Sequence, residues 1–120
     1  MATETHGPEL GDVYIASPKT TPFGDAHGNN ARPVGVTEIQ RRVVSTLTRT
    51  THPTRDCRKL ESPANPQLGL VLGWWTDHKP RPILRRRFDT DECRFRGPLD
   101  DSEREELLRF WRTTKMLGRT

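Results

Sequence analysis

Ten prolines are spread along this chain of 120 residues, in which 31% of the residues are hydrophobic and 30% are charged. Each proline removes a backbone donor and fixes one torsion angle, so it interrupts helices and central strands. Ordering a backbone costs roughly 1–2 kcal/mol per residue, while burial returns about 25 cal/mol for each Å² of apolar surface. The sequence therefore predicts a mostly irregular, extended chain with two short α-helices and no independent globular core, ordered by a larger assembly.

The charge balance indicates an anionic partner. A net charge of +4 and a pI near 9.6 suit nucleic acid, an acidic protein surface or a layer of lipid headgroups. No apolar run approaches the roughly 18 residues of a membrane span, and the N-terminal segment lacks the pattern of a signal peptide or a mitochondrial presequence. Cys57 and Cys93 are too few for a disulfide framework, which fits a reducing compartment. Among these three partners we expect a protein surface or nucleic acid and no membrane.

Residues 1–35 predict an extended N-terminal arm. Tyr14 lies in its only compact apolar group, and Phe23 stands alone beyond it. Because Pro18 and Pro22 separate the two, no helix can connect them. The two rings resemble anchors along a groove, and a disordered tail is the alternative.

Residues 36–50 predict an amphipathic helix. Thr37 can cap its first turn, and Ile39, Val43 and Leu47 recur at every fourth position, so they share one face. The arginines lie on the opposite side. That side is either a solvated face or a contact with nucleic acid.

Residues 51–67 then form a proline-rich connector, and residues 68–98 form an extended anchor segment rich in tryptophan and arginine. Trp74 and Trp75 point in opposite directions if the backbone is extended. Because tryptophan buries much surface, the pair is either an interface hot spot or the core of a self-sufficient domain.

The anchor segment continues with five basic residues among the ten from Lys79 to Phe88, followed by Arg94, Phe95 and Arg96. Arginines interleaved with aromatic rings suit carboxylate or phosphate oxygens. RNA and a carboxylate-rich protein surface both qualify as partners.

Residues 99–118 predict the C-terminal helix. Asp100 can cap it with Glu103 in capping-box register, and its basic residues gather near the C-terminal end. Its apolar side, which includes Trp111, is concentrated in the second half. We therefore expect the helix to dock mainly through that half.

Catalytic and metal-binding patterns are missing from the sequence. It has no glycine-rich phosphate loop, no GxSxG elbow and no HExxH motif. His52, Cys57, His78 and Cys93 lack the close spacing of zinc ligands, and the acids from Asp89 depart from a calcium loop at the next ligand position. We expect no enzyme, no catalytic residue, no cofactor, no metal and no small-molecule substrate.

The order of segments suggests a family. The Gly73-Trp74 pair, the following arginine-rich proline segment and the final tryptophan-containing helix resemble the small microtubule inner proteins of motile cilia and flagella, over residues 68–117. The resemblance implies a structural, non-catalytic component of the ciliary or flagellar axoneme. It would bind tubulin and neighbouring inner proteins in the lumen of doublet microtubules. Acidic tubulin surfaces are complementary to an arginine-rich segment.

The alternative is a small basic accessory protein of a ribosome, such as the mitochondrial one, that contacts rRNA phosphates. Under either interpretation the same side chains contact the partner. These residues are Tyr14, Phe23, Trp74, Trp75, Arg85, Arg86, Arg87, Phe88, Arg94, Phe95, Arg96 and Trp111.

Overall fold

Short runs of valine, isoleucine and threonine build one antiparallel sheet, because branched side chains fit a pleated surface. The computed structural model describes residues 7–17, 31–53, 55 and 57–118, without the side chain of Lys79. Its strands are β1 Asp12–Ala16, β2 Arg32–Ile39, β3 Val43–Thr50, β4 Lys59–Ser62, β5 Gly73–Leu84 and β6 Cys93–Pro98. The strands follow the order β4-β5-β3-β2-β1-β6, so β4 and β6 are the edges.

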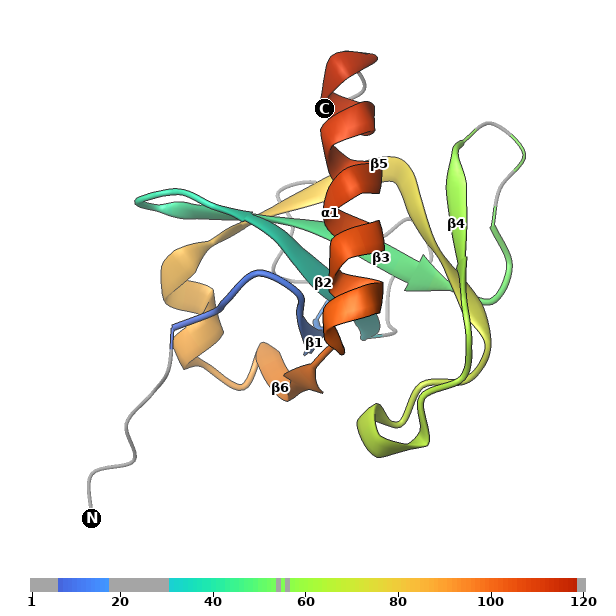
Figure 1. Ribbon diagram of the computed structural model, residues 1–120. Coiled ribbons are helices and arrows are strands. Elements are labelled where there is room, and N and C mark those ends of the chain that lie inside the picture. Colours follow the sequence, from blue (N-terminus) through green and yellow to red (C-terminus); the bar gives the residue numbers. More distant parts are fainter. Residues whose placement is uncertain (1–6, 18–30, 54, 56, 119–120) are drawn as a thin grey trace.

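Three helical elements complete the described chain. Two are 3-10 turns, η2 Pro66–Leu68 and η3 Arg85–Asp89, and the third is the helix α1 Asp101–Met116. Figure 1 shows α1 lying across one face of the sheet. The Cα radius of gyration is 13.5 Å, about the value of a compact domain of this length.

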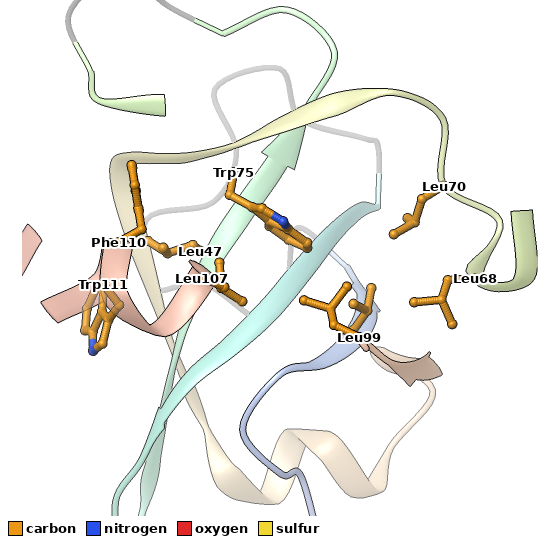
Figure 2. Packing of buried hydrophobic residues seen from close by; sticks show 9 residues of the cluster. Leu47, Leu68, Leu70, Trp75, Leu99, Leu107, Phe110 and Trp111 are labelled. Carbon is orange, nitrogen blue, oxygen red and sulfur yellow. The ribbon is translucent and has the colours of Figure 1, made fainter. Parts of the chain in front are cut away.

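The prediction of an extended chain without its own core is therefore wrong. Buried apolar side chains form two clusters on opposite faces of the sheet, as the alternation of Val13 and Tyr14 along β1 shows. The helix-side core, shown in Figure 2, consists of Val13, Leu47, Leu68, Leu70, Trp75, Leu99, Leu107, Phe110 and Trp111. The η3-side core consists of Tyr14, Ala16, Val34, Val36, Val44, Ile83, Phe88 and Cys93.

Polar side chains complete these cores, and a count of hydrophobic residues overlooks them. Thr46 is fully buried, and its hydroxyl donates to the carbonyl of Arg81 at 2.8 Å. Thr37 is buried as well and donates to the carbonyl of Ser45 at 3.0 Å. Since a bonded hydroxyl can be buried at little cost, the sheet needs fewer apolar residues than composition suggests.

The predicted helix over residues 36–50 is instead part of the hairpin of β2 and β3. Two register shifts explain the error, one between Val36 and Glu38 and one between Thr46 and Thr48. Each shift exchanges the faces to which successive side chains point. Val44 and Thr46 are buried before the second shift, and Leu47 and Arg49 are buried after it, so the strand alternation is hidden in the sequence.

The predicted N-terminal arm and proline-rich connector also contain strands. β1 lies between β2 and β6 in the sheet, with Tyr14 paired to Val34 and Phe95. β4 pairs with β5 through residues 59–62. Phe23 lies outside the described residues. Two segments that the sequence predicts to be irregular thus contribute strands to this chain's own sheet.

The C-terminal helix lies within the predicted range. The Asp100 carboxylate accepts from the backbone N–H of Glu103 at 2.8 Å, which caps the first turn. The buried residues of α1 lie from Leu107 onward. Gly35 on β2 allows this docking, because a Cβ there would lie only 2.9 Å from Cδ2 of Leu107 and 3.1 Å from the Trp75 ring.

Candidate partner-binding surface

Four of the expected partner anchors are core residues in this fold. Trp75 is fully buried, and Tyr14, Phe88 and Trp111 are at most 9% exposed. Tyr14 and Phe88 stack edge to face, with ring centroids 4.8 Å apart. A side chain inside the domain cannot reach a partner while the domain stays folded, so we assign these four rings to the core.

The indole N–H groups of Trp75 and Trp111 bond to carboxylates of the same chain. The Trp75 indole donates to Glu103 at 3.2 Å. The Trp111 indole donates to Glu38 at 2.9 Å, and the Lys115 ammonium donates to the same oxygen at 2.6 Å. These bonds attach α1 to the sheet at two points, and they leave neither indole available to a partner.

Arg49 on β3 is a buried cation that the sequence did not reveal. Its guanidinium lies beneath α1 and donates to the Ser62 hydroxyl at 2.5 Å, to the Pro63 carbonyl at 2.9 Å and to the Val71 carbonyl at 2.8 Å. The Glu103 carboxylate is 3.7 Å away and accepts from the Ser62 hydroxyl. Burial lowers the pKa of Arg49, and the Glu103 charge opposes that shift.

The guanidinium of Arg49 also lies 5.1 Å from the centroid of the Trp75 ring. A charge so close to an aromatic face is stabilised by the ring's quadrupole. No pattern in the sequence distinguishes Arg49 from the exposed arginines, because its burial follows from the register shift in β3 and from the position of α1. Arg49 therefore connects β3 with the segment after β4, with the loop at Val71 and with α1.

A third polar contact attaches the second half of α1. The Asp77 carboxylate accepts from the Arg58 backbone N–H at 2.8 Å and from the Thr114 hydroxyl at 3.3 Å. The Arg58 guanidinium lies 4.4 Å from the centroid of the Phe110 ring. The polar groups under α1 therefore bond to one another.

The edge strand β6, unlike the region beneath α1, presents its arginines and its aromatic ring to solvent. Arg94, Phe95 and Arg96 are consecutive and exposed, with 57% of Phe95 accessible. The Phe95 ring rests on Tyr14 of β1 at a centroid distance of 5.3 Å, so the buried tyrosine supports the exposed ring from below. Within the described part of the chain, no ion pair involves Arg94 or Arg96. The sequence predicted these three residues as contacts, and the fold leaves all three accessible.

The remaining predicted contacts are divided between these two environments. Arg85 and Arg86 are exposed on η3, whereas Arg87 pairs with Glu92 at 2.9 Å. Trp74 is half-buried on β5, where its backbone pairs with Thr50 of β3 and Glu61 of β4. Among these four residues, only Arg85 and Arg86 are exposed cations without an ion pair in the described part of the chain.

The titratable groups near this surface are not activated for chemistry. Burial raises the pKa of the Cys93 thiol to about 11 and that of Tyr14 to about 12, so both stay protonated at neutral pH. Among the described residues, no three or more of the histidine, cysteine and acidic side chains gather as metal ligands would. The protonated Cys93 thiol and Tyr14 hydroxyl are therefore not candidate nucleophiles.

An open hollow between α1 and β4 has a volume of about 290 Å³. It is lined by Arg58, Leu60, Glu106, Arg109, Phe110 and Thr113. This volume is at the lower limit for small-molecule sites, and the Arg58 head group is already engaged with Asp77 and Thr114. The hollow is therefore a small surface depression whose other charged side chains, Glu106 and Arg109, are exposed to solvent.

Comparisons of this chain with protein-family models, with curated proteins and with solved structures give no match. Across the described residues, no helix is both long enough and apolar enough to cross a membrane. The chemistry of the exposed surfaces is the remaining guide to function.

Proposed function

We propose that this protein is a non-catalytic binding module that docks onto an acidic protein surface along the edge strand β6. One observation carries the proposal: Phe95 is 57% exposed on an edge strand between two exposed arginines. An edge strand has backbone groups that no neighbouring strand pairs, so an exposed ring on it offers a partner both an apolar contact and hydrogen bonds.

The chemistry of β6 fits a protein partner. Phe95 supplies an apolar anchor whose position is fixed by Tyr14 beneath it, and a pre-positioned anchor loses little entropy on binding. Arg94 and Arg96 supply planar donors that match carboxylates in pairs. An acidic surface with a small apolar recess would satisfy all three side chains.

Tubulin is the partner that we propose to test first. The resemblance of residues 68–117 to microtubule inner proteins implies it, and acidic tubulin surfaces are complementary to β6. The protein would then be a structural component of the ciliary or flagellar axoneme, attached as a folded domain rather than as an extended strap. A mitochondrial ribosomal protein that contacts rRNA is the alternative.

Co-sedimentation with microtubules tests the surface directly. The variant with Phe95→Ala and Arg94→Glu should bind at least about tenfold more weakly, since it loses the anchor and reverses one charge. Arg112→Glu is the matched control, because Arg112 is exposed on α1 and lies outside β6. If the unmodified protein does not sediment with microtubules, tubulin is excluded as the partner. If it sediments and both variants bind alike, β6 is not the contact.

A tagged copy expressed in ciliated cells tests the cellular proposal. Retention on axonemes after extraction with detergent and salt supports a structural component of the doublet. Location in mitochondria together with nuclease-sensitive sedimentation supports the ribosomal alternative. Neither outcome depends on whether β6 is the surface that contacts the partner.

A further inference from the structure

Two pairs of arginines that are far apart in the sequence meet at one end of the sheet. Arg41 and Arg42 form the turn between β2 and β3, and Arg85 and Arg86 begin η3 directly after β5. The Arg85 backbone N–H donates to the Arg42 carbonyl at 2.8 Å, next to the register pair of Val43 with Leu84. Figure 1 shows this turn at the end of the β2–β3 hairpin. We call these four residues the arginine corner.

The positive charge of the arginine corner is not neutralised by the described parts of the chain. All four side chains are exposed, and none of them takes part in an ion pair among those residues. Glu38, which lies three residues before Arg41, accepts from Lys115 and Trp111 of α1 and from Gln40. Glu92 is engaged by Arg87. Two acids that might have compensated the corner therefore bond elsewhere.

The backbone fixes the relative position of the two segments that carry the four arginines. The β2–β3 turn carries Arg41 and Arg42, and η3 begins with Arg85 and Arg86. Because a backbone hydrogen bond joins these two segments, the four arginines originate close together. Like charges held together repel one another, and an anion that contacts several of them removes this repulsion. The arrangement therefore favours a ligand with several negative charges in a row.

We propose that the arginine corner binds the phosphate backbone of nucleic acid, independently of the protein contact proposed for β6. The guanidinium fork matches phosphate oxygens in pairs. The corner also lacks an aromatic ring of the kind that β6 presents, and Leu84, 42% exposed, is the large apolar side chain beside it. Four charges without an aromatic anchor suit a backbone of repeated phosphates better than a protein interface, whose core is depleted of charge and enriched in aromatic residues.

This proposal has a quantitative consequence. A protein that neutralises four phosphates of a single strand should show a slope of about −3 in a plot of log affinity against log salt. Binding should not depend on base sequence, because no base-reading side chain belongs to the corner. Fluorescence anisotropy with a labelled oligouridylate, between about 50 and about 200 mM salt, measures the slope.

Two pairs of charge reversals isolate the site. The Arg42→Glu and Arg85→Glu variant removes one cation from each segment, and the Arg109→Glu and Arg112→Glu control removes two exposed cations from α1. Both variants change the net charge by the same amount. The corner variant should bind oligouridylate about 100-fold more weakly, with a clearly shallower salt slope, while the control should lose less than about threefold. Equal losses in both variants would mean that net charge alone drives binding, which overturns the proposal.

Further arms identify the ligand class and separate the two proposals. The assignment to phosphate backbones would be overturned if polyglutamate displaced oligouridylate at equal charge concentration. It would also be overturned if the protein bound anionic vesicles in preference to oligouridylate. The β6 variant with Phe95→Ala and Arg94→Glu should lose microtubule binding and keep its salt slope on oligouridylate. Thermal unfolding of every variant establishes that each one is folded. Failure of one surface is thereby distinguished from failure of the other.

Discussion

The arginines beneath α1 and the arginines on β6 and η3 have the same chemistry and opposite surroundings. Arg49 is 4% exposed, with its donors bonded to Ser62, Pro63 and Val71 and with Glu103 beside it. Arg94 and Arg85 are exposed, and neither forms an ion pair within the described residues. A satisfied, buried arginine stabilises the fold, and an accessible one is left for a partner.

The aromatic residues show the same division. Trp75 lies under α1 and Trp111 lies on the buried side of α1, each with its indole N–H on a carboxylate, while Phe95 projects from an edge strand. Arginine and aromatic content alone therefore does not locate an interface. Substitutions in the two regions should therefore differ in their effect on stability.

The largest expected effect is the loss of the central ring of the helix-side core. Trp75→Ala should lower the free energy of unfolding by about 3–5 kcal/mol, because it leaves a cavity beneath α1. Phe95→Ala should lower it by under about 1 kcal/mol, since that ring is largely exposed. Urea denaturation of both variants makes the comparison. Similar losses of unfolding free energy in the two variants would contradict the assignment of Trp75 to the core and of Phe95 to the surface.

Arg49→Met should cost about 3 kcal/mol, which is near the lower end of the range for breaking a buried ion pair. Glu103 keeps Ser62 and Trp75 as donors, so the remaining charge is partly compensated. Arg94→Met is the control and should change the free energy of unfolding by no more than about 0.5 kcal/mol. The same urea titration measures both. A loss as small for Arg49 as for Arg94 would contradict the structural role of the buried arginine.

Asp100→Ala should cost about 1 kcal/mol through the loss of the N-terminal cap of α1. Asp91→Ala is the control, because Asp91 is exposed in the turn before β6. Thermal unfolding followed by circular dichroism measures the difference in midpoint. Equal midpoints in the two variants would mean that the cap contributes nothing to the docking of α1.

The smallest expected effect is a pH dependence from Glu38. Hydrogen bonds from Lys115 and Trp111 lower the pKa of this carboxyl from 4.5 to about 2. Because the folded state holds the charged form, the contribution of Glu38 is present above pH 4.5 and is lost as the pH falls towards 2. It should amount to under about 1 kcal/mol, since the side chain is partly exposed. The difference in stability between the protein and Glu38→Gln, measured across this range, should shrink as the pH falls; a constant difference would exclude the linkage.

The C-terminal helix was predictable because its signals are local. Asp100 caps it, the acids follow in the first turn, and the apolar side begins at Leu107, all within one stretch of sequence. The exposed arginines of β6 were predictable for a similar reason, since charged residues favour solvent. The strands β2 and β3 were not predictable in this way. Their register shifts arise from pairing with other strands, and a shifted strand can show the spacing of a helix.

The candidate site was only partly predictable. Phe95 was expected to contact a partner and is accessible, whereas Trp75 was expected at the same kind of site and is buried. The sequence allowed Trp75 to be either an interface residue or a core residue, and nothing local separates the two. Only the position of α1, which places Leu107 against the ring, assigns Trp75 to the core.

The sequence by itself determined the positive charge, the capped final helix and the interleaving of arginine with aromatic residues, because these depend on residue identity and near neighbours. The tertiary structure decided which arginines bond internally, which rings are buried, and that residues 41–42 meet residues 85–86. These outcomes depend on long-range strand pairing. Local sequence carries little information about strand pairing, because each backbone hydrogen bond in a sheet joins segments that can lie far apart along the chain.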